Sequence, residues 1–118
     1  MKKIIPICLL LLTVYPSQWV GAHAVITDYS LKITPIRANS AAQVELSFNS
    51  KIELGLSQIF LVSIGDKHTL LQADNGSKQG QIIIHVPPLE AGDYALRFKV
   101  FAADGHLTED VIHFSVSE

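Results

Sequence analysis

The sequence predicts an all-β protein, a seven-stranded antiparallel Greek-key sandwich or barrel of the immunoglobulin-like type, which follows a cleaved signal peptide. The chain has 118 residues, enough for one small domain. After an apolar N-terminal segment come short runs rich in β-branched and aromatic residues, each closed by turn residues. No stretch has the sustained helical periodicity that a crossover helix requires, so we expect antiparallel strands in two packed sheets.

The N-terminal segment has the layout of a secretory signal peptide. Lys2 and Lys3 give it a positive start, residues 4–14 are almost entirely apolar, and Ala22 ends a short stretch of small or modest residues. The apolar run of about 11 residues is too short to span a bilayer, which takes roughly 20. We therefore expect residues 1–22 to be removed during export, and no membrane anchor to remain.

Cleavage after Ala22 would leave residues 23–118 as one domain that begins with His23. Cleavage after Ala24 is the alternative, and it would remove His23. The only Cys, Met and Trp all precede residue 23, so this domain has no disulfide and a metal site in it must use nitrogen and oxygen ligands. Seven Lys and Arg then stand against eleven Asp and Glu, a formal net charge of −4, which disfavours nucleic acid and anionic membranes as partners.

The expected strands are short and are separated by turn signals. They cover residues 23–36, 44–48, 59–64, 69–71, 81–86, 94–100 and 112–116. The run 44–48 alternates apolar and polar residues, as a strand with one buried face does. Residues 74–77 form a polar turn around an Asn-Gly pair, because both residue types tolerate positive φ. Pro87 ends the strand before it, since proline cannot donate to a ladder.

The last two strands have the clearest pattern. In the first of them one face carries Tyr94, Leu96, Phe98 and Val100, and in the second one face carries Ile112, Phe114 and Val116. Residues 102–106 form the turn that joins them. Residues 49–57 fit either a loop or a short helical turn. The first strand, over residues 23–36, has the weakest pattern.

Three of the five histidines fit surface positions. His68 follows a polar turn, and His113 lies on the outward phase of the last strand. His85 lies on the face opposite the apolar positions of its strand, so we expect it to be exposed or at a sheet edge. None of the three is expected to bind a metal.

His23 is different because signal cleavage would free its α-amine. The amine and the imidazole of one residue can chelate a metal ion in a single ring. The reference pKa of the amine, about 7.7–8.0, lets a metal displace its proton near neutral pH. Two joined nitrogens suit Cu(II), which prefers tetragonal nitrogen and oxygen ligands. Taken alone, the position equally fits a histidine that merely follows the signal peptide.

The turn Asp104-Gly105-His106 offers further donors. Side chains at positions i and i+2 around a glycine can aim at one point when the turn is tight. A carboxylate and an imidazole would complete a set of three nitrogens and one oxygen with His23. The alternative is a polar β-turn with no ligand role, for which Asp-Gly is common.

The sequence from Pro88 onward resembles the C-terminal signature of the CopC family of periplasmic copper-binding proteins. That family has a Gly-x-Tyr strand, an Asp-Gly-His turn and a closing Phe-x-Val, which correspond here to residues 92–94, 104–106 and 114–116. The family also begins its mature chain with His and has a Leu-x-Phe strand like residues 46–48. The resemblance therefore spans the whole expected domain.

The resemblance implies a seven-stranded β-barrel or sandwich that binds Cu(II) through His23, Asp104 and His106. It also implies a role in copper homeostasis or copper resistance beside a CopD-like inner-membrane partner.

This chain departs from the family after the Leu-x-Phe strand. Relatives commonly have Ser and then an acidic residue near the copper, whereas this chain has Asn49 and Ser50. Whether Ser50 or Glu53 substitutes for the acidic residue stays open. A Met-rich Cu(I) segment, found in some relatives, is absent.

The sequence thus predicts a monomeric, non-catalytic carrier or scavenger of Cu(II). The alternative is a non-catalytic immunoglobulin-like interaction module with a degenerate metal site, which would bind Cu(II) no better than a random His peptide. The copper brace of polysaccharide monooxygenases also uses an N-terminal His, but those enzymes are larger and have a flat substrate face. No nucleophile–base pair or carboxylate dyad stands at a spacing suited to hydrolysis.

Overall fold

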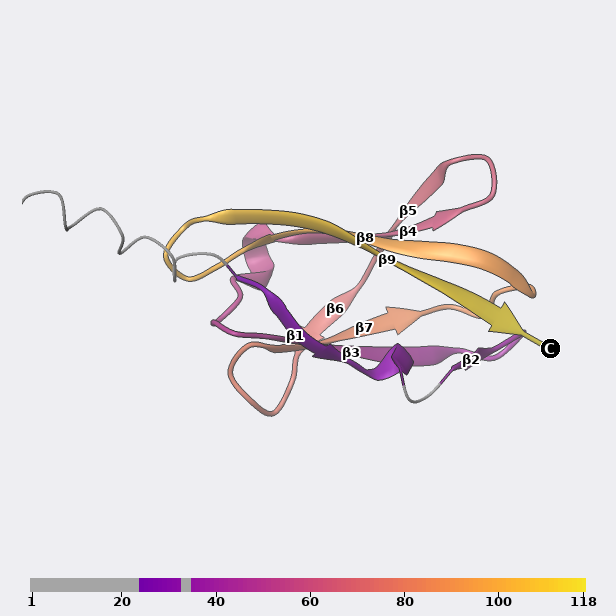
Figure 1. Ribbon diagram of the computed structural model, residues 1–118, viewed down its shortest axis with the longest axis horizontal. Coiled ribbons are helices and arrows are strands. Elements are labelled where there is room, and N and C mark those ends of the chain that lie inside the picture. Colours follow the sequence, from indigo (N-terminus) through magenta and orange to yellow (C-terminus); the bar gives the residue numbers. More distant parts are fainter. Residues whose placement is uncertain (1–23, 33–34) are drawn as a thin grey trace, which may run out of the picture.

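Two β-sheets pack face to face in the computed structural model, which describes residues 24–32 and 35–118 (Figure 1). The first sheet has the order β1-β3-β7-β6, with β1 Ile26–Tyr29, β3 Ala42–Phe48, β7 Gln81–Val86 and β6 Ala73–Asn75. The second has the order β2-β9-β8-β4-β5, with β2 Ile36–Arg37, β9 Leu107–Ser117, β8 Gly92–Phe101, β4 Gln58–Ser63 and β5 Lys67–Leu71. Two short 3-10 helices, η2 Ser30–Lys32 and η3 Leu54–Leu56, complete the described chain. None of its helices is long and apolar enough to cross a membrane.

The all-β sandwich is confirmed, but the described residues form nine strands, not seven. The expected strand 23–36 is divided, because the chain turns through η2 and then joins the other sheet as β2. There β2 pairs with β9 in parallel, an exception to the expected antiparallel pairing. Residues 74–75, predicted in a turn, belong to β6, where Asn75 pairs with Ile82. The predicted signal peptide, residues 1–22, and His23 lie outside the described residues.

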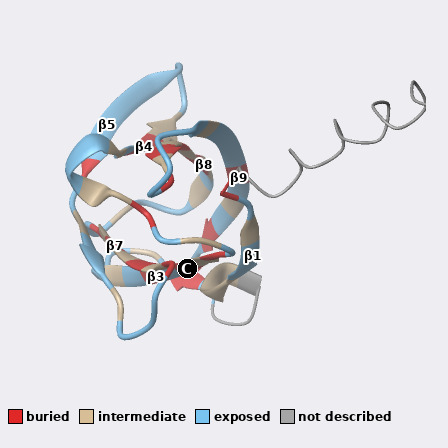
Figure 2. Ribbon diagram, turned by 90° about the vertical axis from the view of Figure 1, so that its left-hand side faces the viewer, coloured by how far each residue is buried: buried red, intermediate tan, exposed pale blue. Residues whose placement is uncertain are grey.

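The core lies between the two sheets, where alternate residues of the long strands meet (Figure 2). The side chains of Val44, Leu46, Ile82, Ile84, Leu96, Phe98 and Val100 are all 0% exposed. The rings of Phe48 and Phe98, one from each sheet, meet edge to face with centroids 6.0 Å apart. Burial of this alternating set confirms the period-2 patterns predicted for β3, β7 and β8.

A tyrosine fixes the start of the β8–β9 hairpin. The Tyr94 hydroxyl donates to the carbonyl of Glu90, four residues earlier, at 2.8 Å. Its ring stacks on Phe114 of β9, with centroids 5.8 Å apart. Such a bond from a tyrosine to upstream backbone is a feature of immunoglobulin-like sandwiches. Tyr94 pairs with Phe114 in the ladder, so these contacts help to set the register of the two strands that the turn at residues 102–106 joins.

A Gly80→Ala substitution is expected to destabilise the fold by about 1–3 kcal/mol. Gly80 has φ +85, and a Cβ there would stand 2.5 Å from the carbonyl oxygen of Phe48. The carbonyl of Phe48 belongs to the backbone of β3, so it cannot move aside as the end of a flexible side chain could. Urea unfolding measures the loss, with Gly55→Ala as the control, because a Cβ on Gly55 meets nothing within 4 Å. Equal stability of the two variants would contradict the expectation.

Candidate metal centre

The turn between β8 and β9 carries the predicted Asp104-Gly105-His106 triplet. The backbone N–H of Gly105 donates to the carbonyl of Ala102 at 2.9 Å, and the N–H of Ala102 donates to the carbonyl of His106 at 3.0 Å. Gly105 has φ +92, in the left-handed region that glycine enters without strain. The sequence thus closes a tight turn and leaves its two polar side chains at the surface.

Asp104 and His106 contact each other directly. The carboxylate Oδ1 accepts the backbone N–H of His106, and Oδ2 lies 3.0 Å from the imidazole Nδ1. The His106 and Asp104 side chains are 46% and 44% exposed. The backbone hydrogen bond from His106 is the main cause that lowers the pKa of Asp104, and the nearby imidazole adds to it. The turn therefore holds a negatively charged carboxylate beside an imidazole.

The described chain begins one residue after His23. Ala24 is fully buried in the core. Val25 is held by Asn49 through two hydrogen bonds, since its N–H donates to the Asn49 Oδ1 at 2.8 Å and its carbonyl accepts the Asn49 N–H at 3.0 Å. The chain is therefore held by hydrogen bonds and burial from Ala24 onward, directly after His23 in the sequence.

The loop that holds Val25 also holds the β8–β9 turn. The carbonyl of Lys51 accepts the N–H of Ala103 at 3.0 Å, and Ile52 forms a β-bridge with Ala102. Figure 1 shows the start of β1 and the β8–β9 turn at the same end of the sandwich. We call residues 49–52 the connector loop, because they join the two segments that carry the predicted ligands.

The described part of the site supplies two donors, one oxygen and one nitrogen. No group of three or more His, Cys, Asp or Glu side chains gathers elsewhere in the described ranges. A charged carboxylate and an imidazole suit a borderline divalent ion such as Cu(II) or Zn²⁺. His23, the third ligand predicted from the sequence, lies outside the described residues. The donor chemistry of the turn therefore fits copper but does not complete a site alone.

The two proposed substitutes for the acidic residue lie beside the turn. Ser50 is in the connector loop, and its buried hydroxyl has no hydrogen-bond partner among the residues that the structure describes. Glu53 follows the loop, and its N–H donates to the carbonyl of Phe101 at 2.9 Å. The Glu53 bond does not involve Asp104 or His106, and the Ser50 hydroxyl is hydrogen-bonded to neither of them. The structure therefore does not favour Ser50 or Glu53 as the substitute. The unpaired hydroxyl of Ser50 was not foreseeable from sequence, since it depends on burial by neighbouring segments.

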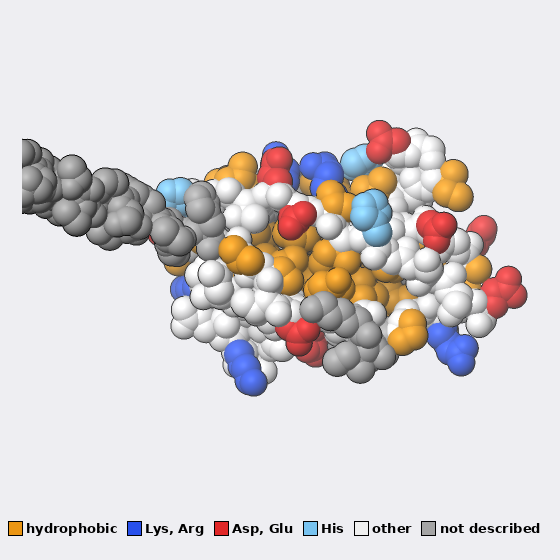
Figure 3. Space-filling view, in the orientation of Figure 1, with side chains coloured by type: hydrophobic (Ala, Val, Ile, Leu, Met, Phe, Trp, Pro, Cys, Tyr) orange, Lys and Arg blue, Asp and Glu red, His pale blue; other side chains and the backbone are white. Residues whose placement is uncertain are grey.

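The surface positions predicted for His68 and His113 are confirmed, whereas His85 is neither fully exposed nor on an edge strand, because β7 lies between β3 and β6. His68 and His113 are exposed, and His68 pairs with Asp66 at 2.8 Å. His85 is half-buried on the outer face of β7, where its Nε2 lies 2.6 Å from Oδ2 of Asp74. On the face drawn in Figure 3, acidic and basic side chains are interspersed, without a patch of Lys and Arg.

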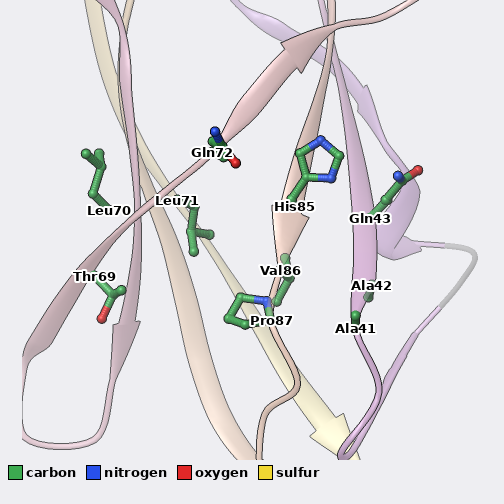
Figure 4. Close-up of a pocket in the computed structure, with 10 residues that line it drawn as sticks. All are labelled: Ala41, Ala42, Gln43, Thr69, Leu70, Leu71, Gln72, His85, Val86 and Pro87. Atoms are coloured by element: carbon green, nitrogen blue, oxygen red, sulfur yellow. The ribbon is translucent and has the colours of Figure 1, made fainter.

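A groove lies away from the turn, at the other end of β3. It has a volume of about 720 Å³ and lies between β5 and the ends of β3 and β7 (Figure 4). Val86, Leu71 and Pro87 give it apolar walls, and His85 and Gln43 are its polar side chains. Because Ala42 pairs with Val86 at the opposite end of β3 from Asn49, this groove is separate from the metal centre.

The fold and the site define a small two-sheet sandwich with an Asp–His pair at one end. The CopC domain matches residues 34–117, and the chain belongs to the CopC family. It is similar to CopC from Methylosinus trichosporium OB3b, with a TM-score of 0.70 and 27% identity, over 80% of this chain and 94% of that one.

The chain is also similar to PcoC, a methionine-rich copper resistance protein from Escherichia coli. The TM-score is 0.61 and the identity 21%, over 80% of this chain and 99% of that one. At this identity the likeness shows the fold alone. No curated protein matches the chain. The predicted family membership is confirmed.

Proposed function

We propose that this protein is exported to the periplasm, is cleaved after Ala22 and binds one Cu(II) ion at its new N-terminus. The ligands are the amine and imidazole of His23 together with Asp104 and His106. The observation that supports this set is the connector loop, because it fixes Val25 and the β8–β9 turn at one end of the sandwich. Membership of the CopC family supports copper as the ion.

The contact between Asp104 and His106 prepares both side chains for a metal. Their hydrogen bond keeps the imidazole beside a charged carboxylate. An ion bound by both groups would replace this contact, and the imidazole nitrogen that binds it must carry no proton. The carboxylate of Asp104 is charged at neutral pH, as it must be to bind a metal, and the hydrogen bond from the His106 backbone N–H favours that charged form. Cu(II) leads the divalent affinity order for such nitrogen and oxygen donors.

The site suits a carrier more than an enzyme. Both described donors are partly exposed, so an acceptor can approach the ion. We infer a monomeric, non-catalytic protein of copper homeostasis or resistance that passes the ion to a CopD-like inner-membrane partner. The chain has a single Met, at position 1. After cleavage it therefore lacks the thioether ligands that suit Cu(I).

Substitution of His106 tests the proposal. Cu(II) titration of the mature protein, followed by electron paramagnetic resonance, is expected to show binding about 100-fold weaker in His106→Ala. Loss of a direct ligand costs at least as much as loss of an outer-shell partner, which costs 10–100-fold. His113→Ala is the matched control, because His113 is an exposed histidine on the same hairpin.

Two results would count against this function. If both histidine variants bind like the unaltered protein, the turn is not part of the site. If the unaltered protein binds Cu(II) no better than an unfolded peptide with the same histidines, the chain is an immunoglobulin-like interaction module with a degenerate site.

A further inference from the structure

Asn49 stands directly after β3, at the junction between the sheet and the connector loop. Its side chain accepts the N–H of Val25 at 2.8 Å, and its own N–H donates to the carbonyl of Val25 at 3.0 Å. These two bonds use both backbone polar groups of Val25. The side-chain amide thus acts as an extra peptide group that extends the β1–β3 ladder by one step.

This extension matters because the ladder between β1 and β3 is short and contains a shift in register. Ile26 pairs with Phe48, but the register shifts between Ile26 and Asp28, and the strand has four residues. Beyond Ile26 no further residue of β3 is available to pair with the chain. Without the Asn49 side chain, the N–H of Val25 would lose its partner, and the first described residues would be held only by the backbone bond from residue 49 to the Val25 carbonyl and by the burial of Ala24.

The same short stretch reaches the metal-binding turn. Two residues after Asn49, the carbonyl of Lys51 accepts the N–H of Ala103, the residue before Asp104. The path from Val25 to the turn therefore runs through two hydrogen-bonded junctions and three residues of backbone.

We propose that Asn49 is a positioning residue for the metal centre, which holds the N-terminal segment so that the amine and imidazole of His23 face Asp104 and His106. This inference rests on the proposed function. Asn49 itself does not touch the ion. Asn49 determines how much of the chain end is already ordered before the ion binds. A pre-ordered chain end binds the ion more tightly, because less conformational freedom is lost on binding.

The inference is tested with Asn49→Ala and Asn49→Asp in the mature protein. The alanine removes the acceptor for Val25, whereas the aspartate keeps an oxygen there. Gln43→Ala is the control, since Gln43 is an exposed polar residue at the other end of the same strand. Cu(II) affinity is expected to fall about 10- to 100-fold in Asn49→Ala. Asn49→Asp and Gln43→Ala are expected to keep it within about threefold of the unaltered protein.

A second readout needs no copper. In the metal-free protein, the amide hydrogen of Val25 is expected to exchange with solvent about tenfold faster in Asn49→Ala. Exchange of the Leu96 amide, in the centre of β8, reports on global unfolding and corrects for any general loss of stability. A faster Val25 amide with an unchanged Leu96 amide shows local release of the chain end.

The outcomes separate this inference from the proposed function. If Asn49→Ala binds Cu(II) like the unaltered protein while His106→Ala loses affinity, the positioning role is wrong and the metal centre stands. If Val25 exchange is the same in all variants, the hydrogen bond from the Val25 N–H to the Asn49 side chain does not hold the chain end and the inference also fails. If His106→Ala retains full affinity, the proposed function fails first, and the positioning role falls with it.

Discussion

Acetylation of the α-amine of His23 is expected to weaken Cu(II) binding by about 1,000-fold, or roughly 4 kcal/mol. The acetyl group removes one donor and breaks the chelate ring that joins it to the imidazole, so two of the four proposed ligands are affected. The remaining donors, Asp104 and His106, are partly exposed and make a weak pair in water.

The reaction can be directed to this amine. Its reference pKa of about 7.7–8.0 lies well below that of lysine, about 10.4, so at mildly acidic to neutral pH the α-amine is the more reactive group. Mass spectrometry of the exported chain first establishes that it begins at His23. Titration with paramagnetic resonance then compares acetylated and untreated protein. An unchanged spectrum and affinity would show that the amine is not a ligand.

A Phe98→Ala substitution is expected to reduce the free energy of unfolding by about 3–5 kcal/mol. Phe98 is 0% exposed and meets Phe48 of the opposite sheet edge to face. The cavity would open in the centre of the sandwich, where the strands cannot collapse onto it. Such a loss is a large part of the 5–15 kcal/mol by which domains of this kind are stable.

Phe60 provides the control for this measurement. It lies on the neighbouring strand β4 but faces outward, with the guanidinium carbon of Arg97 4.7 Å from its ring centre. Phe60→Ala is expected to cost about 1 kcal/mol, because its ring is already partly in water. Urea unfolding monitored by circular dichroism compares the two variants. Similar losses would mean that Phe98 does not anchor the core.

The long strands were predictable because their hydrophobic pattern is a local property. Alternation in residues 44–48, 81–86 and 94–100 gives both the strand and its buried face, and the structure confirms both. The short strands were not predictable in the same way. β2 has two residues and β6 has three, too few for a period to appear, and each exists only because a neighbouring strand offers its edge.

The candidate site shows the same division. The turn Asp104-Gly105-His106 was predictable, because the glycine and the spacing of the two ligands are encoded in three consecutive residues. The role of Asn49 was not, since its bond to Val25 joins residues 24 positions apart. From sequence, Asn49 was only a departure from the family pattern. Whether His23 completes the set stays a prediction.

The two halves of the proposed site differ in how firmly the fold holds them. The Asp–His half depends on bonds within residues 102–106 at the tip of the longest hairpin of the described chain. The other half depends on β1, a four-residue strand at the edge of its sheet. Edge strands of this length open with a free energy far below that of global unfolding. Detachment of β1 would therefore withdraw the chain end from the other proposed ligands, Asp104 and His106, while the rest of the sandwich stayed folded. An acceptor could then reach the ion without unfolding of the whole protein.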